Sequence, residues 1–338
     1  MKFFRYIKSN LKLKHIIILI LISISLQCLT LFFLDKFYFK DNTEVKMKQV
    51  NVPKPKAKAE LHVDMPGGIN DILVSYDGKF ITYNEKNLVN IVNTTNGEKQ
   101  SIENLNTEDL LKSIWLPDRN LMLFLQKESN KINLYNYDVE KKSKQRIITI
   151  TNYLSTYKDF NIKSSAITGV IYVKIDSMIY RTDINQTKVI EVPIRIKDST
   201  DIFIIPTKDR VVYEDVKNSI YLTQPKEKLN IKSDSQTKIL GVDDESIIYL
   251  GELKDGKVIS IISSSPKKER LKLTKETEIK DIFVNNKGEV FVNDSSKNVI
   301  TELLSLKETK YEGSFLSFYN NGVTSILNGK YYKIKFDK

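Results

Sequence analysis

Residues 74–83 read Val-Ser-Tyr-Asp-Gly-Lys-Phe-Ile-Thr-Tyr, and residues 115–124 read Trp-Leu-Pro-Asp-Arg-Asn-Leu-Met-Leu-Phe. In both stretches a polar turn with Asp near its centre leads into an apolar strand. Asp, Asn and Gly favour tight turns because they tolerate positive φ or bond their own backbone. A strand that is apolar on both faces must be covered on both faces. The two stretches therefore predict hairpins whose second strand is buried between layers.

The same unit recurs seven times after residue 66, at intervals of about 40 residues. An interval of about 40 residues for a four-stranded unit is typical of propeller blades, and radial packing covers both faces of every sheet. We therefore expect an all-β fold, a seven-bladed β-propeller, with six or eight blades as alternatives. The predicted turns lie at 76–79, 117–120, 167–169, 207–209, 243–245, 286–288 and 320–322.

An aromatic residue recurs on the second strand of five units, and we expect these side chains to be buried between neighbouring blades. They are Phe80, Phe124, Tyr172, Tyr249 and Phe291.

Residues 74–83 and 115–124 resemble the Trp-Ser-Pro-Asp-Gly repeat of TolB-like propellers and of the N-terminal propeller of dipeptidyl-peptidase IV. The continuation at 133–140, Asn-Leu-Tyr-Asn-Tyr-Asp-Val-Glu, is similar to the segment that follows that repeat. The resemblance covers two units well, and the other five keep only its hydrophobic outline. It implies a WD40-like propeller fold and transfers no active site, because such propellers have many roles.

Residues 16–34 form an uncharged apolar run of nineteen residues, preceded by five basic residues and no acidic one. A helix of this length spans about 28 Å, close to the hydrocarbon core of a bilayer. By the positive-inside rule the N-terminus is cytoplasmic and the rest of the chain is extracytoplasmic. The alternatives are a buried core helix and a signal peptide cleaved near Ser23–Ser25. Gln27 argues against lipid attachment at Cys28.

These observations predict four segments. Residues 1–15 form a cytoplasmic basic segment, 16–34 a single transmembrane helix that acts as a signal-anchor, 35–58 an extended linker, and 59–338 the propeller. Pro53 and Pro55, with lysines that repel one another, favour the extended linker.

The predicted seventh unit is one strand short of a four-stranded blade. Just before the first unit, Leu61, Val63 and Met65 alternate with Glu60, His62 and Asp64, which is the pattern of a half-covered strand. We expect residues 59–65 to close the ring by pairing with the C-terminal strand at 331–336.

Residue types restrict the chemistry. The two histidines are His15 and His62 and the single cysteine is Cys28, so a propeller after residue 66 lacks the residues for a Ser-His-Asp triad, a Cys nucleophile or a His-ligated zinc. The net charge of +11 falls to +4 after residue 66, and only 7 of the 53 basic residues are arginines. We therefore expect no nucleic-acid partner.

The remaining candidates for chemistry lie in turns. Asp243, Asp244 and Glu245 could pair carboxylates or bind a hard cation, and Asp77 and Asp118 occupy similar positions; we interpret all of them as solvated turn residues. Trp115 is interpreted as a core anchor. We therefore expect no catalytic, cofactor-binding or metal-binding residues and no cofactor, and ligand-binding residues are not identified by the sequence.

The sequence favours a non-enzymatic, membrane-tethered extracytoplasmic domain that senses or binds a protein or ligand on one propeller face. Two alternatives stay open. The chain could be a structural subunit of a cell-envelope complex, or a hydrolase or lyase that uses carboxylates on glycans.

Overall fold

The computed structural model describes residues 2–38, 63–66, 72–185, 188–196, 200–231, 233, 235–265 and 270–336. The chain divides into two compact units, Met1–Lys58 and Ala59–Lys338.

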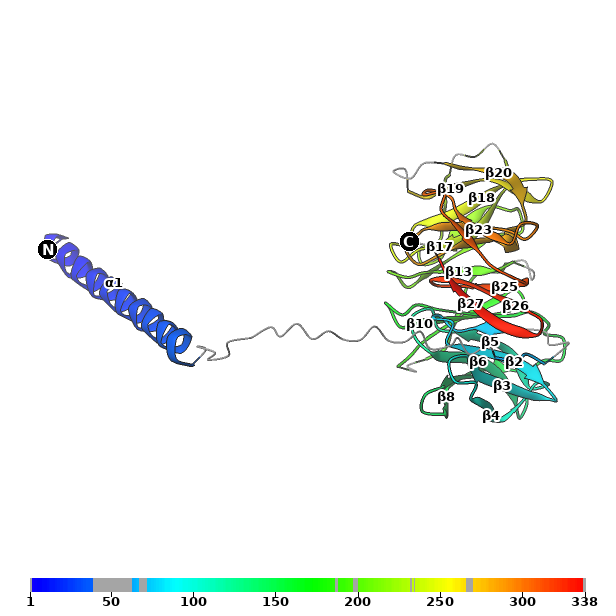
Figure 1. The fold of residues 1–338 in the computed structure, drawn as a ribbon. Helices are drawn as coiled ribbons and strands as arrows, with labels where there is room; N and C mark the ends of the chain where they lie inside the picture. Colours follow the sequence, from blue (N-terminus) through cyan, green and yellow to red (C-terminus); the bar gives the residue numbers. More distant parts are fainter. Residues whose placement is uncertain are drawn as a thin grey trace, which may run out of the picture. The chain divides into compact units, whose positions relative to one another are not determined.

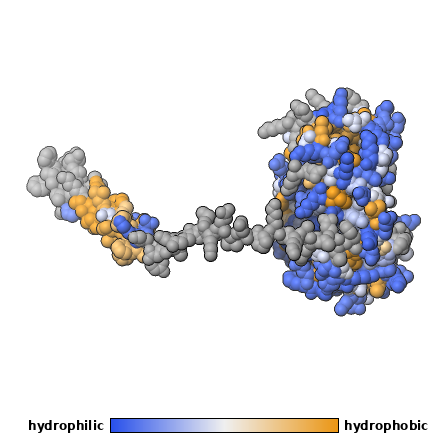
Figure 2. Space-filling view, in the orientation of Figure 1, coloured by the Kyte–Doolittle hydropathy of each residue, from blue (hydrophilic) through white to orange (hydrophobic). Residues whose placement is uncertain are grey.

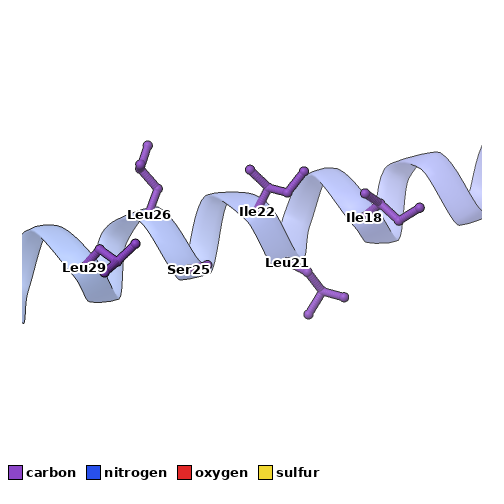
Figure 3. A pocket seen from close by; sticks show the side chains of 6 residues that line it. All are labelled: Ile18, Leu21, Ile22, Ser25, Leu26 and Leu29. Atoms are coloured by element: carbon purple, nitrogen blue, oxygen red, sulfur yellow. The ribbon is translucent and has the colours of Figure 1, made fainter.

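The first unit contains helix α1 (Lys2–Phe33) followed by one π-helical turn, η1 (Leu34–Tyr38). The stretch Ile17–Phe37 is long and apolar enough to cross a membrane, and its hydrophobic surface stands out in Figure 2. Residues 35–38 were expected in the linker but are helical. The apolar stretch extends to Phe37, three residues beyond the expected end of the membrane helix, and the helix extends with it. A shallow apolar groove runs along the helix (Figure 3); it is lined by Ile18, Leu21, Ile22, Ser25, Leu26 and Leu29.

The second unit is a β-propeller of seven antiparallel sheets, here blades 1 to 7 (Figure 1). Blades 1 to 3 comprise β1 (Leu73–Val74), β2 (Phe80–Glu85), β3 (Leu88–Asn93) and β4 (Lys99–Asn106); β5 (Leu110–Trp115), β6 (Leu121–Glu128), β7 (Lys131–Asp138) and β8 (Ser143–Asn152); and β9 (Phe160–Ser164), β10 (Val170–Ile175), β11 (Met178–Asp183) and β12 (Ile190–Val192). Blades 4 and 5 comprise β13 (Ile202–Ile205), β14 (Arg210–Glu214), β15 (Ile220–Leu222) and β16 (Glu227–Lys228); and β17 (Thr237–Val242), β18 (Ile248–Lys254), β19 (Lys257–Ser263) and β20 (Leu271–Thr277). Blade 6 comprises β21 (Ile282–Val284), β22 (Val290–Asp294), β23 (Val299–Glu302) and β24 (Glu308–Lys310), preceded by the 3-10 turn η2 (Ile279–Asp281), and blade 7 comprises β25 (Ser314–Tyr319), β26 (Gly322–Leu327) and β27 (Lys330–Lys335).

The ring is closed through its first strands. Neighbouring first strands contact one another in the order β1, β5, β9, β13, β17 and β21, and β25 of blade 7 contacts β1. The seven-bladed prediction is confirmed. Each of the seven predicted turns connects the first and second strands of a blade. In blade 1, Gly78 takes the positive φ of +68° that this turn needs.

The core lies between blades rather than at one centre. All five recurrent aromatic residues are on second strands and none is more than 5% exposed, so their predicted burial is confirmed. Phe124 of blade 2 packs with Val89 and Ile91 of blade 1, and Tyr172 of blade 3 packs with Val211 of blade 4. Each pair of neighbouring blades thus shares one apolar layer.

Residues 63–65 lie beside the last strand, β27. The Met65 N–H donates to the Gly329 carbonyl oxygen at 2.7 Å, and Asp64 forms an antiparallel bridge with Lys330. Val63 and Met65 are buried while Asp64 is exposed. Residues 59–62, the rest of the expected closing strand, lie outside the described residues.

Candidate functional site

The turns between first and second strands lie on one face of the propeller, which we call the turn face. They bond one another from blade to blade. The Asp244 N–H donates to the Asn286 carbonyl oxygen at 2.9 Å, joining blades 5 and 6. The Asn320 N–H donates to the Tyr76 carbonyl oxygen at 3.2 Å, joining blades 7 and 1. These contacts hold the turns in fixed relative positions, so side chains between them are preorganised.

A pocket of about 460 Å³ opens among these turns, and we call it the channel pocket. It is lined by first strands and turns of five successive blades, blades 2 to 6, so it lies at the centre of the ring. Its polar and aromatic lining comprises Trp115, Asp118, Lys163, Ser164, Ser165, Phe203, Asp244 and Asn286.

Two carboxylates contribute to the channel pocket from separate blades. Asp118 Oδ2 accepts hydrogen bonds from Nε and Nη2 of Arg119 at 2.9 and 2.6 Å. Burial raises the pKa of Asp244, and the negative charges of Asp243 and Asp118 raise it further. Asp118 and Asp244 therefore both bring a carboxylate to the same pocket.

Lys163 brings a positive charge to the same pocket. Its Nζ lies 5.1 Å from the centroid of the Phe203 ring, a cation–π contact. Burial lowers the pKa of Lys163; the charge of Asp201 opposes this shift and that of Lys112 adds to it. Within the described residues, no hydrogen bond or ion pair holds this ammonium group.

Trp115 contacts both the apolar core and the channel pocket. Its ring stacks on Phe80 of blade 1 at a centroid distance of 6.1 Å, as expected of a core anchor. The same side chain also lines the channel pocket, and its buried Nε1 has no hydrogen-bond partner among the described residues. Trp115 therefore has two environments, one in the core and one at the pocket.

The acidic run at 243–245 is divided by the fold. Asp243 is buried, and hydrogen bonds satisfy its carboxylate: Oδ1 accepts the Ile247 N–H at 2.8 Å and Oδ2 accepts the Tyr249 hydroxyl at 2.9 Å. The interpretation of Asp243 as a solvated residue is therefore wrong. Asp244 and Glu245 are both exposed, as interpreted, and Asp244 also lines the pocket.

Asp77 stabilises its turn: Oδ1 accepts the Lys79 N–H and the Ser75 hydroxyl, each at 2.9 Å. Within the described ranges, no three His, Cys, Asp or Glu side chains come close enough to hold a metal ion.

The sequence did not identify Lys163, Phe203 or Asn286 as pocket residues. One feature of the sequence could have indicated Lys163: it is a charged residue in the short strand Phe160–Ser164, next to the apolar Ile162. Phe203 and Asn286 carry no such signal, because only the closed ring brings their blades to one pocket.

No known protein family matches the sequence, and no curated protein is significantly similar to it. Solved structures do resemble it. The crystal structure of Kluyvelomyces marxianus Hsv2 is 14% identical, with a TM-score of 0.51 over 81% of this chain and 98% of that one. A chain of the mitotic checkpoint complex is 11% identical, with a TM-score of 0.52 over 88% of this chain and 99% of that one. At these identities the likeness shows the fold alone, and the TolB-like resemblance stays a prediction.

Proposed function

We propose that this chain is a membrane-anchored, extracytoplasmic propeller that binds a protein or ligand on its turn face without catalysing a reaction. The observation that carries the proposal is the channel pocket, where five blades contribute preorganised side chains to one site. Rigid scaffolds that present loops around a concave site are typical of binding domains.

The anchor is supported by the stretch Ile17–Phe37 and by the five basic residues before it. With the positive charges retained in the cytoplasm, the propeller lies on the outer side. A protein partner is proposed by analogy only, because a chain of similar fold belongs to the mitotic checkpoint complex, whose name describes a multi-protein assembly.

A second candidate function is that of a hydrolase or lyase that cleaves a glycan. It is favoured by one observation: Asp118 and Asp244 share the pocket, and the charge of Asp118 raises the pKa of Asp244. Glycan-cleaving enzymes use two carboxyl groups whose pKa values differ.

Site-specific photo-crosslinking in intact cells tests the binding proposal. A photoreactive residue replaces Ile167, which is 59% exposed, lies in a turn of the turn face and lines the pocket. The matched control replaces Val216, which is 69% exposed and lies in the turn between β14 and β15, at the other ends of these strands. We expect a defined adduct from position 167 and none from 216. Equal labelling from both positions, or none from either, would contradict binding on the turn face.

External protease tests the topology in the same cells. We expect removal of nearly the whole chain and an N-terminus that still begins at Met1 or Lys2. A mature N-terminus near Leu26 would show that the apolar run is a cleaved signal peptide.

A further inference from the structure

We propose that the channel pocket binds a neutral, hydroxyl-rich ligand, namely one or two sugar units of a glycan. This inference rests on the proposed function, since it names the ligand of the same site.

The first step concerns groups without partners. Within the described residues, two buried atoms of the pocket lining, Trp115 Nε1 and Asp118 Oδ1, have no hydrogen-bond partner. The side chains of Lys163, Ser164, Asp244 and Asn286 also line the pocket and are half-buried or exposed, so a ligand can reach them. Lys163 can only donate, Asp244 as a carboxylate can only accept, and Ser164 and Asn286 can do both. The pocket therefore offers donors and acceptors together.

The second step concerns charge. Asp118 is paired with Arg119, so the uncompensated charges of the pocket are Lys163 and Asp244. An anionic ligand would be attracted by Lys163 but repelled by Asp244, and a cationic ligand would meet the opposite problem. Lys163 and Asp244 line one pocket without forming an ion pair, and both side chains are accessible to solvent, so each can bond a ligand. A sugar hydroxyl both donates and accepts, so adjacent hydroxyls of one neutral ring can satisfy both groups.

The third step concerns the apolar wall. Ile114, Ile162 and Phe203 line the pocket beside the polar groups. A pyranose ring has C–H faces as well as hydroxyl edges, and such faces lose little by leaving water for an apolar wall. The volume of about 460 Å³ lies in the range of sites for small ligands.

The protein carries a built-in reporter for the test. Trp115 is its single tryptophan and lines the pocket, so its emission responds to changes there. The full chain is placed in lipid nanodiscs, because common sugar-based detergents would compete for the site. It is then titrated with maltose, cellobiose and N,N′-diacetylchitobiose, and with one acidic and one basic peptide.

We expect a saturable emission change with at least one disaccharide and none with either peptide. Lys163→Met and Asp244→Asn should each weaken binding about tenfold, the loss of one hydrogen bond to a charged group. Lys217→Met and Asp255→Asn are matched controls in exposed turns outside the pocket and should leave binding unchanged within about twofold. Unchanged melting temperatures show that all four variants are folded.

Three outcomes would overturn the inference. If no disaccharide changes the emission up to about 10 mM while Ile167 still crosslinks a partner, the sugar proposal fails and the proposed function stands. If a peptide binds instead, and Lys163→Met or Asp244→Asn removes its binding, the pocket recognises protein. If neither crosslinks nor ligand binding are found, both proposals fail. Release of shortened sugars that Asp244→Asn abolishes would support sugar recognition and replace the binding function with the enzymatic one.

Discussion

The Tyr331 N–H donates to the Val63 carbonyl oxygen at 3.0 Å, which places Val63, the first described residue of the second compact unit, beside the last strand of that unit. Val63 and Met65 are buried in one cluster with Ile81 and Tyr331. Blade 7 has three strands of its own, and residues 63–65 lie at its outer edge. We propose that the full closing strand is 59–65, which pairs the two ends of the ring and leaves β27 without a free edge.

Removing the apolar contacts of this closure should destabilise the propeller. The double variant Val63→Ala, Met65→Ala removes two buried side chains and should lower stability by about 3–5 kcal/mol. For a propeller of this size we expect the melting temperature to fall by about 6–15 °C. Circular dichroism of the full chain in nanodiscs measures the change.

Asp64→Ala is the matched control, because Asp64 lies between the two residues and is exposed. Its melting temperature should stay within about 2 °C of the wild type. A loss as large as that of the double variant would show that the Asp64 side chain, and not apolar burial alone, holds the segment. Deletion of 59–65 should be more severe than either, whereas deletion of 42–52 should have little effect.

The layers between blades give a second prediction. Phe124 is fully buried between blades 1 and 2, so Phe124→Ala should cost about 3–5 kcal/mol through lost transfer energy and a cavity. Leu304→Ala is the control, because Leu304 is 68% exposed, and should cost less than about 0.5 kcal/mol. The free energies of unfolding of both variants are measured by chemical denaturation, and they are compared on the condition that the two m-values are equal. Similar midpoints would contradict the assigned packing.

The blade number was predictable because its signals are local. The first turns of blades 1, 3 and 6 each have a glycine at positive φ, and each second strand is apolar because two neighbours cover it. The outer strands were less predictable: β16 has only two residues, Glu227 and Lys228, both exposed, so no apolar pattern marks it.

The candidate site was not predictable in the same way. Asp118 and Asp244 belong to blades 2 and 5, and only the closed ring brings both residues to one pocket. The buried role of Asp243 was missed for a related reason, because its partner Tyr249 lies on the following strand and not in the turn. Local pattern predicted the repeating unit, whereas contacts between units determine the site.

A polar contact between blades 3 and 4 gives a third prediction. Asp209 accepts the Tyr172 hydroxyl at 2.7 Å and two Arg181 N–H groups at 2.8 and 3.1 Å. Asp209→Ala should lower stability by about 2 kcal/mol, because it leaves two partly buried donors without their acceptor. Tyr172→Phe removes one of these bonds and should cost about 1 kcal/mol.

The double variant of Asp209→Ala and Tyr172→Phe distinguishes a network from separate effects. If the tyrosine acts through Asp209, the double variant should be about as unstable as Asp209→Ala alone. Strictly additive losses in thermal denaturation would argue against a direct Tyr172–Asp209 interaction.

Alkaline pH should weaken the propeller through its buried tyrosines. Burial raises the pKa of Tyr135 to about 12, and the hydrogen bond of its hydroxyl to Glu128 Oε2 at 2.6 Å adds to the shift. Burial also raises the pKa of Tyr172, Tyr249 and Tyr331. A tyrosine in the unfolded chain ionises near pH 10. The folded state therefore holds the proton more tightly, so its contribution to stability is complete below about pH 10 and is lost as pH rises toward about 12.

Tyr135→Phe isolates one of these groups. The variant keeps the ring that stacks on Phe124 at 5.4 Å but has no proton to lose. Free energies of unfolding measured by urea denaturation from about pH 8 to 11.5 should fall less steeply for the variant than for the wild type. The difference in slope should approach about 1.4 kcal/mol per pH unit, the linkage of one proton, above pH 10. At pH 8 the variant should be slightly less stable, because it lacks the hydrogen bond to Glu128. If the free energies of unfolding of the two proteins fall with pH at the same slope, ionisation of Tyr135 does not destabilise the folded state.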